Sequence, residues 1–353
     1  MHRRIAASAA ALAISLAAAG CSAVGTTGDE AGEDASSTVV LLTHDSFAVS
    51  KQVLADFEQE SGLSVRIRAT GDAGTLVNQL VLTKDAPLGD AVYGIDNAFA
   101  SRALDAGVLE SYRSPGAEGL VAGLDIDDTA RLTPVDYGDV CINVDRQWFA
   151  ERDVPEPRSL LDLTDPAYED LLVVSDPATS SPGLAFLLAT IDAFGEDGWQ
   201  EYWAALRDNG LKVSNSWSDA YFVDFSGSSG EGPRPLVLSY ASSPPAEATA
   251  GGGRSPTRAL LDTCFRQVEY AGVLTGAANP EGARTLIDFL LSTSFQEDLP
   301  EKMYVYPADP KAQLPRDWVR FAPLAERPYT VDPATIDANR EQWIEQWTDL
   351  VVG

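Results

Sequence analysis

Histidine is scarce in this sequence: the chain has two, and only His44 lies beyond residue 20. A Ser-His-Asp or Cys-His catalytic device would need that single imidazole beside a nucleophile. The sequence also lacks a Gly-x-Ser-x-Gly elbow, a phosphate-binding Gly-Lys-Ser/Thr loop and a dinucleotide-binding glycine pattern where a strand meets a helix. These absences argue against an enzyme. A secreted hydrolase that uses one pair of the many carboxylates is a distant alternative.

Positive charge is scarce as well. The chain carries 25 Lys and Arg against 53 Asp and Glu, a formal net charge of −28 at pH 7. A field of this sign repels nucleic acid, so we expect no nucleic-acid partner. It favours cationic ligands weakly, and acidity that serves only solubility fits the same numbers. The 353 residues and 45% hydrophobic content suffice for a globular protein of two ordinary domains.

The N-terminal segment predicts export. Arg3 and Arg4 precede an almost unbroken apolar run over residues 5–19, which is short for a membrane span and typical of a secretory signal. The Ala-Gly pair directly before Cys21 resembles the bacterial lipobox, in which the cysteine is lipidated and becomes the new N-terminus. We therefore expect residues 1–21 to be a lipoprotein signal peptide with lipidated Cys21. An ordinary signal peptide that is cleaved nearby is the alternative.

Residues 22–37 are mostly small, polar and acidic. They cannot bury enough apolar surface to fold, so they should form a flexible tether that keeps the protein near the membrane. If Cys21 carries lipid, two cysteines remain, Cys141 and Cys264. An even pair in an exported protein suggests a disulfide, and two buried free thiols are the alternative.

Strand-like and helix-like segments alternate in the first part of the predicted mature chain. Expected strands are at 39–42, 63–67 and 90–95, and expected helices at 49–60 and 75–84. This alternation favours a parallel-sheet α/β architecture. Ligands of such sheets bind beyond the carboxyl ends of the strands, so polar turns that follow strands should converge on one edge. The turns concerned are at 43–47, 71–75 and 96–97.

A second α/β unit is expected to begin near Val140. Its expected strands are at 172–174, 236–238 and 266–273, and its expected helices lie after Pro182, at 197–207, at 280–292 and from about 334 onward. Trp343 and Trp347 are spaced i,i+4 on the last helix, which predicts core packing rather than ligand contact. Gly251–Gly253 should form a surface loop.

Four segments place hydroxyls, backbone amides or aromatics in loops: 176–183, 216–221, 239–244 and 304–307. In the first, Ser180 or Ser181 is placed to cap a helix with Pro182 in its first turn. A helix start offers amides to an anion, and a capped helix without a ligand is the alternative. The aromatics of the other segments, with carboxylates nearby, suit a flat cationic heterocycle through stacking and cation–π attraction.

The same segments carry a resemblance that runs from about Val39 to Trp347. Its motifs follow one another in a common order: Asp45-Ser46-Phe47, Gly94-Ile95-Asp96-Asn97, Val135-Asp136-Tyr137-Gly138, Asp176-Pro177, residues 179–184, Trp217-Ser218-Asp219-Ala220-Tyr221, Val237-Leu238-Ser239-Tyr240, Ser243-Pro244, Tyr306-Pro307 and Trp343-Ile344-x-x-Trp347. In these motifs the chain resembles the thiamine-binding proteins of bacterial thiamine ABC importers.

The resemblance implies a type II periplasmic-binding-protein fold of the α/β class, in which two lobes with mixed sheets are joined by crossing hinge strands and close on the ligand. Lobe 1 would comprise residues 38–137 and 266–310. Lobe 2 would comprise residues 138–265, and the C-terminal helices in 311–353 would belong to it or span both lobes. The crossing strands lie side by side in this fold, which implies a Cys141–Cys264 disulfide at the hinge.

The resemblance also implies a ligand and the residues that bind it, with no cofactor and no metal. Thiamine or a thiamine phosphate would be the transported ligand, with Ser180, Ser181 and Trp217 at its phosphate end and aromatic and acidic residues at its rings. The expected ligand-binding residues are His44, Asp45, Asp72, Asp96, Ser180, Ser181, Trp217, Tyr221, Tyr240 and Tyr304.

Four positions depart from the pattern of this family. His44 stands where tyrosine is frequent, and Tyr304 stands where tryptophan is usual. Ala178 occupies a position that can be arginine, and the absence of an arginine there should weaken a preference for phosphorylated thiamine. Ala246 falls where a ring-stacking tyrosine is found, and a missing stack costs about 1 kcal/mol of affinity.

These observations predict a monomeric, extracytoplasmic, lipid-anchored solute-binding protein that captures thiamine and delivers it to the permease of an ABC importer. The ligand would bridge the two lobes and stabilise the closed form through its higher affinity for that form. Ferric iron, a polyamine or a phosphonate in the same fold is the alternative. Iron-binding relatives usually use adjacent tyrosines, and this chain has no Tyr-Tyr pair.

Overall fold

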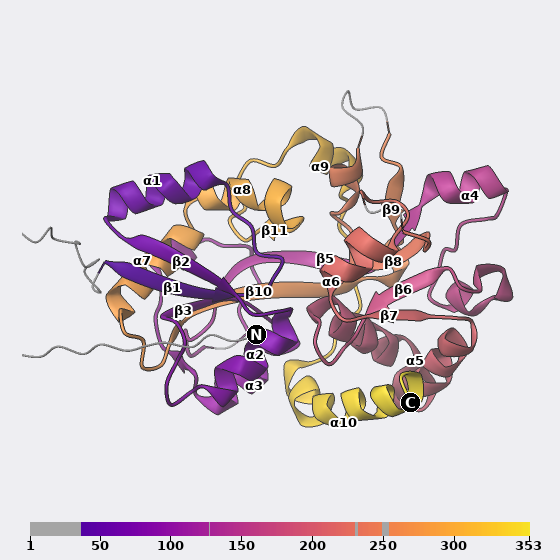
Figure 1. Ribbon diagram of the computed structural model, residues 1–353, viewed down its shortest axis with the longest axis horizontal. Helices are drawn as coiled ribbons and strands as arrows, with labels where there is room; N and C mark the ends of the chain where they lie inside the picture. Colours follow the sequence, from indigo (N-terminus) through magenta and orange to yellow (C-terminus); the bar gives the residue numbers. More distant parts are fainter. Residues whose placement is uncertain (1–36, 127, 230–231, 249–253) are drawn as a thin grey trace, which may run out of the picture. The chain divides into compact units, whose positions relative to one another are not determined.

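A mixed β-sheet organises the computed structural model (Figure 1), which describes residues 37–126, 128–229, 232–248 and 254–353. The predicted signal peptide with Cys21, most of the predicted tether and the Gly251–Gly253 loop lie outside these residues. The strands are β1 (Thr38–Thr43), β2 (Ser64–Ala69), β3 (Ala91–Asp96), β4 (Leu109–Glu110), β5 (Thr133–Asp145), β6 (Leu172–Ser175), β7 (Lys212–Ser214), β8 (Leu236–Tyr240), β9 (Thr257–Ala259), β10 (Phe265–Leu274) and β11 (Tyr306–Pro307).

Helices connect these strands. They are α1 (Lys51–Ser61), α2 (Ala73–Leu82), α3 (Ala100–Ala106), α4 (Arg146–Arg152), α5 (Ser181–Asp208), α6 (Trp217–Asp219), α7 (Pro280–Leu290), α8 (Thr293–Met303), α9 (Arg316–Phe321) and α10 (Pro333–Val351). Short 3-10 turns lie at Pro115–Ala117, Leu161–Thr164, Pro166–Tyr168, Pro244–Glu247 and Leu261–Thr263, and a π-helical turn at Ala220–Asp224.

The first α/β unit matches its prediction closely. β1 pairs in parallel with both β2 and β3, and α1 and α2 are the crossover helices between them. Gly62 ends α1 in the left-handed conformation, with φ 72°, which glycine adopts without steric cost. Asp72 begins α2, where its side chain accepts a hydrogen bond from the Ala73 amide at 2.8 Å. The alternation of strand and helix therefore predicted this part of the fold correctly.

Two long antiparallel strands, β5 and β10, connect this unit to the rest of the sheet. The order is β2-β1-β3-β10-β5-β8-β6-β7, so β10 pairs with β3 on one side and with β5 on the other. In Figure 1 the two strands run side by side between the two groups of shorter strands. The predicted mixed α/β architecture with crossing strands is confirmed. The boundaries of the two lobes stay a prediction, because residues 35–353 pack as one compact unit.

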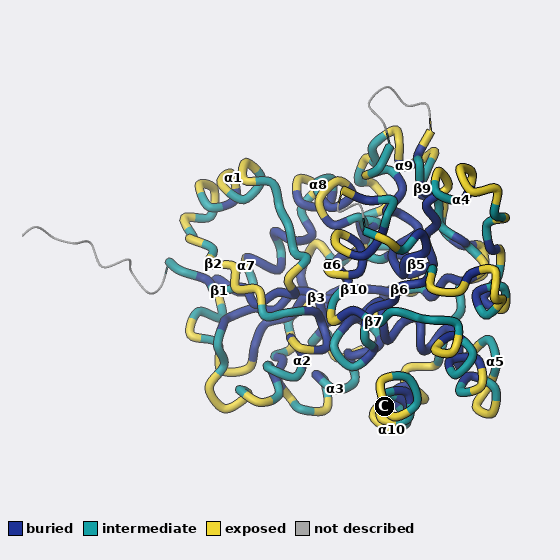
Figure 2. The backbone as a smooth tube through the Cα atoms, turned by 45° about the vertical axis from the view of Figure 1, so that its right-hand side comes forward, coloured by how far each residue is buried: buried dark blue, intermediate teal, exposed yellow. Residues whose placement is uncertain are grey.

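The second α/β unit holds the longest helix, α5. Helices were predicted separately after Pro182 and at 197–207. The structure joins them, but Gly195 has the non-helical angles φ 72° and ψ 175° and separates two helical halves. β6 pairs in parallel with β7 and β8, and Figure 2 shows β6 and β8 buried and β7 partly buried, while the outer sides of α1 and α10 are exposed.

The C-terminal helix α10 packs against α5. Trp347 is fully buried and meets Trp203 of α5 edge to face, with ring centroids 5.3 Å apart. Trp343 is buried on the same face. The prediction that both tryptophans belong to the core rather than to a ligand site is confirmed, because aromatic rings at i,i+4 lie on one helical stripe.

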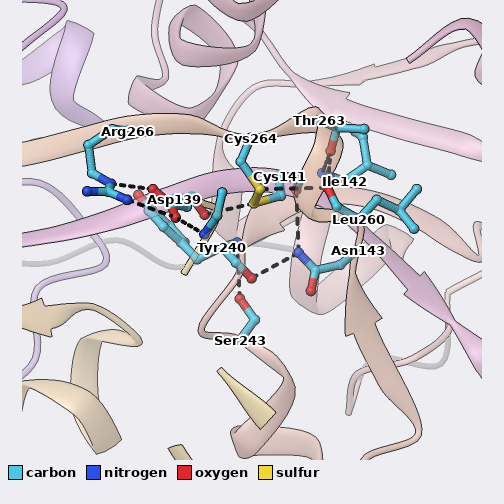
Figure 3. Close-up of a disulfide and its surroundings, with 11 residues drawn as sticks. Asp139, Cys141, Ile142, Asn143, Tyr240, Ser243, Leu260, Thr263, Cys264 and Arg266 are labelled. Carbon is cyan, nitrogen blue, oxygen red and sulfur yellow. Dashed lines mark hydrogen bonds and ion pairs between the residues drawn. A yellow bond between two sulfur atoms is a disulfide. The ribbon is translucent and has the colours of Figure 1, made fainter. Parts of the chain in front are cut away.

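A disulfide links the two crossing strands (Figure 3). Cys141 lies in β5, and Cys264 directly precedes β10, with their Cα atoms 4.2 Å apart. The pairing register of Phe265 with Val140 brings the two cysteines together. The structure therefore contains the pairing that the resemblance implied. An ion pair between Arg266 and Asp139 links the same two strands.

Candidate ligand-binding site

Loops from both α/β units meet at one buried cavity. The turn after β1 and the start of α2 contribute from the first unit, while the starts of α5 and α6 and the end of β8 contribute from the second. The cavity is lined by His44, Ser46, Asp72, Ser181, Pro182, Trp217, Tyr240, Glu269, Met303 and Val305. The polar turns at 43–47 and 71–75 follow parallel strands, so their convergence agrees with the predicted placement of ligands at strand ends.

An aromatic cluster forms one wall. The Trp217 ring stacks on Tyr221 with centroids 5.2 Å apart and an interplanar angle of 19°. The rings of Tyr240 and Tyr304 approach Trp217 edge to face at 6.2 and 6.1 Å. The indole nitrogen donates to Ser239 Oγ at 2.9 Å, which fixes the ring in place. The structure thus brings together aromatics from three separate segments of the sequence, but Tyr221 lies behind Trp217 rather than on the cavity surface.

The serines at the start of α5 have different environments. Ser180 is the N-cap residue, but its hydroxyl donates to Ser175 at 2.8 Å and makes no capping bond. Ser181 lines the cavity and donates to the Asp96 carboxylate. Pro182 stands in the first helical turn as predicted. Ser181, rather than Ser180, is therefore the hydroxyl at the cavity surface.

A buried ion pair lies at the side of β10. His44 Nε2 is 3.3 Å from Glu269 Oε1, and the two side chains are 7% and 6% exposed. Burial is the largest influence on the pKa of His44 and would lower it, but the charge and hydrogen bond of Glu269 together with the charges of Asp72 and Asp45 outweigh burial, so this pKa lies above its ordinary value of 6.5. Burial would raise the pKa of Glu269, and attraction to His44 brings it below its ordinary value instead. Both shifts favour the charged form of the pair.

Carboxyl groups on three adjacent strands face one another. Glu269 on β10 is in register with Asp96 on β3 and with Asp136 on β5. Burial and the charge of Glu269 raise the pKa of Asp136 well above its ordinary range. Burial raises the pKa of Asp96 to about 7, and it raises the pKa of Asp72 as well. Protons therefore reduce the like-charge repulsion within this row.

The structure places half of the predicted ligand-binding residues on the cavity surface: His44, Asp72, Ser181, Trp217 and Tyr240. The others lie elsewhere. Asp45 is exposed to solvent, and Asp96, Ser180 and Tyr221 are buried behind the lining. Tyr304 lines a neighbouring hollow of about 430 Å³ together with Ala246. Direct ligand contact by these five residues stays a prediction.

Sequence reasoning missed half of the lining: Ser46, Pro182, Glu269, Met303 and Val305. Ser46 and Pro182 lay inside motifs that had been noted, but neither was selected as a ligand residue. Glu269 had a detectable signal, because a charged residue interrupts the run from Val268 to Val273 in a strand that is otherwise largely apolar. A charge inside a buried strand needs a partner or a function.

The two units touch directly around the cavity. The Trp217 amide donates to Asp72 Oδ2 at 3.2 Å, the Gly74 amide donates to the carbonyl of Thr179 at 3.0 Å, and the hydroxyls of Ser46 and Ser218 lie 3.2 Å apart. The cavity measures about 20 Å³, which is room for about one water molecule. A two-ring ligand therefore needs these contacts to open before it can enter.

Asp96 provides a pH test of this arrangement. The folded protein retains the Asp96 proton up to about pH 7, whereas the unfolded chain loses it near 3.8. Ionisation therefore favours unfolding as pH rises through that window. Asp96→Asn keeps the oxygen that accepts from the Ala98 and Phe99 amides at 2.7 and 2.9 Å. We expect the difference in unfolding free energy between the variant and wild type to favour the variant more at pH 8 than at pH 5, as measured by urea unfolding. An equal difference in unfolding free energy at both pH values would contradict this assignment.

Within residues 37–353, apart from the gaps at 127, 230–231 and 249–253, no group of three His, Cys, Asp or Glu side chains is arranged to hold a metal ion. In the same ranges no helix combines the length and the apolar composition needed to cross a membrane.

The fold and the placement of the cavity define the class. A mixed sheet crossed by two antiparallel strands, with the site at strand ends between two α/β units, is the type II periplasmic-binding-protein architecture. The chain belongs to the bacterial extracellular solute-binding protein family, whose pattern matches residues 87–318.

Named relatives share most of the chain. A thiamine-binding periplasmic protein of Brucella suis is 29% identical over 323 residues, which cover 89% of this chain and 92% of that protein. One of Escherichia coli is 28% identical over 319 residues, which cover 89% of this chain and 93% of that protein.

Solved structures agree on the fold. A periplasmic thiamin binding protein superposes with a TM-score of 0.79 at 26% identity, covering 89% of this chain and 96% of that chain. A ferric binding protein from Campylobacter jejuni superposes with a TM-score of 0.72 at 13% identity, covering 88% of this chain and 99% of that chain. The second similarity concerns the fold alone, because proteins of this fold bind unrelated ligands.

Proposed function

We propose that the protein captures thiamine or a thiamine phosphate outside the cytoplasm and delivers it to the permease of an ABC importer. One observation carries the proposal: the rings of Trp217 and Tyr240 meet beside two buried carboxylates, Asp72 and Glu269, in one cavity. Thiamine combines a cationic thiazolium with an aminopyrimidine ring. Aromatic faces attract a flat cation, and carboxylates balance its charge or accept from its amino group.

The opposite end of the ligand would lie at the start of α5. Ser181 and Pro182 line the cavity there, and the first amides of a helix favour negative charge or hydroxyl oxygens. This end suits either the hydroxyethyl group of thiamine or its phosphates. Ala178 offers no cationic side chain to a phosphate, so the proposal includes both forms of the ligand.

The proposed mechanism is binding rather than catalysis. The cavity lies between segments of both α/β units, so a bound ligand would hold them together and shift the protein toward a closed state. The names of the relatives support an extracytoplasmic location for this chain. We further propose that a monomer is tethered to the membrane through lipidated Cys21.

A thermal-shift panel tests the ligand. The panel holds thiamine, its monophosphate and pyrophosphate, spermidine, Fe³⁺ and a phosphonate. A ligand at about one hundred times its Kd stabilises the folded state by roughly 2.7 kcal/mol, which raises the melting temperature measurably. We expect a rise with at least one thiamine form. A rise in melting temperature only with spermidine, Fe³⁺ or the phosphonate would show that this compound, and not thiamine, is the ligand.

Ala246 offers a test by gain of affinity. It lines the 430 Å³ hollow beside Tyr304, so a larger ring fits there without displacing the core. We expect Ala246→Tyr to add an aromatic contact to the ligand worth about 1 kcal/mol, close to a fivefold lower Kd for thiamine. Ala248→Tyr, two residues further along, is the matched control and should leave the Kd unchanged. Equal thiamine affinity of Ala246→Tyr and wild type would show that this hollow is not part of the ligand site.

A further inference from the structure

The cavity contains an ionisable basic side chain of the protein itself. His44 and Glu269 both line it, and the imidazole lies at ion-pair distance from the carboxylate with both groups almost fully buried. The other groups that act on His44 are Asp45, Asp72 and the ring of Tyr93, 5.7 Å away. Of these groups Asp45 is exposed to solvent, whereas Glu269, Asp72 and Tyr93 are buried.

Glu269 has few means of balancing its charge other than His44. Asp136 and Asp96 stand opposite it on the neighbouring strands, and both are carboxyl groups. The Tyr93 hydroxyl donates mainly to Asp136 and lies 3.4 Å from Glu269. Asp136 and Glu269 are paired across β5 and β10, and burial together with the charge of Glu269 raises the pKa of Asp136 well above its ordinary range. The Tyr240 hydroxyl lies near this row and accepts from Gln267 at 3.0 Å.

We propose that His44 is a built-in counter-ion that neutralises Glu269 until a cationic ligand arrives, and that the bound ligand takes over this charge while the imidazolium releases its proton. The inference rests on the proposed function, because it requires a cationic ligand. On release the N–H bond of His44 breaks, the electron pair stays on the nitrogen and the proton passes to bulk water. His44 and Glu269 thereby become specificity-determining residues, since a neutral ligand cannot replace the imidazolium charge.

The pH dependence of this exchange has a defined sign. A protonated His44 competes with the ligand for Glu269, so affinity for a cation should rise as pH increases through the pKa of His44. Above that pKa the imidazole is already neutral and no proton is released. A ligand that stays neutral across this pH range, such as the isolated, unquaternised hydroxyethylthiazole half of thiamine, should show no such dependence.

Histidine NMR on the full chain tests the first half of the inference without a ligand. The chain has two histidines, and His44→Gln assigns the Cε1–H signals by removing one of them. We expect the pKa of His44 to lie above 6.5 in wild type and to fall by about one pH unit or more in Glu269→Gln. A pKa of His44 that is unchanged in Glu269→Gln would overturn the inference. Circular dichroism of each variant verifies that it is folded.

The second half of the inference, release of the His44 proton on ligand binding, is tested with thiamine as the probe. We expect saturating thiamine to lower the pKa of His44, and calorimetry at pH 6 in phosphate and in Bis-Tris, two buffers with different ionisation enthalpies, to show release of up to one proton per ligand. Thiamine binding with an unchanged His44 pKa would overturn the inference and leave the proposed function standing. Absence of thiamine binding would overturn the proposed function, and the ligand-free comparison with Glu269→Gln would still decide whether His44 is the counter-ion.

Discussion

Tyr240→Ala weakens thiamine binding by about 2 kcal/mol, close to thirtyfold in Kd, if the cavity is the ligand site. Tyr240 ends β8 on the cavity surface, with its ring against Trp217 and its hydroxyl bonded to Gln267. Truncation removes the ring that a flat cation would contact and loosens the indole beside it. Isothermal titration of the folded variant measures the change.

Two variants separate ligand contact from general damage. Tyr240→Phe keeps the ring and loses only the bond to Gln267, so its Kd should stay within about twofold of wild type. Tyr202→Ala truncates an equally buried tyrosine that stacks on Phe194 in α5, away from the cavity lining. It should lose stability without changing the Kd of the folded fraction. Matching losses of affinity in Tyr240→Ala and Tyr202→Ala would show that Tyr240 acts only through stability.

Removal of the disulfide gives the second large effect. The double variant Cys141→Ala, Cys264→Ala should lose about 2–5 kcal/mol of unfolding free energy. The bond closes a sequence separation of 123 residues, so its loss frees a long loop in the unfolded chain. Urea unfolding of wild type and variant measures the difference.

Reduced wild-type protein is the matched control for this variant. With a reducing agent present throughout, wild type should unfold at nearly the midpoint of the double variant. Mass mapping of the non-reduced protein should recover a Cys141–Cys264 peptide. Coincident midpoints of oxidised wild type and variant, or alkylation at both positions without reduction, would contradict the assignment.

The sequence predicted the first α/β unit well because local patterns and tertiary structure agree there. Strands 39–42 and 90–95 are apolar, and each helix has clear ends. The residue patterns did not predict the crossing strand β5, which runs from Thr133 to Asp145; they indicated only that a second α/β unit begins near Val140. Pro134 and Gly138 are poor strand formers, and pairing with β10 on one side and β8 on the other overrides that preference.

The sequence predicted only part of the site, again because tertiary contacts decide what local patterns do not. Motif positions identify residues near strand ends, but not which way each side chain points. Tyr304 illustrates this, because it ends α8 with φ 59° and lines the outer hollow rather than the cavity. Asp96, whose ligand contact stays a prediction, lies behind the lining, where its Oδ1 accepts from the Ala98 and Phe99 amides and its Oδ2 accepts from Ser181. Such orientations depend on long-range contacts that no local pattern specifies.

Direct titration of thiamine into the ligand-free protein tests the central claim. The account predicts saturable binding of one thiamine per chain, weakened by Tyr240→Ala and strengthened as pH rises from 6 to 8. The absence of heat and of thermal stabilisation with thiamine, its monophosphate and its pyrophosphate would contradict it.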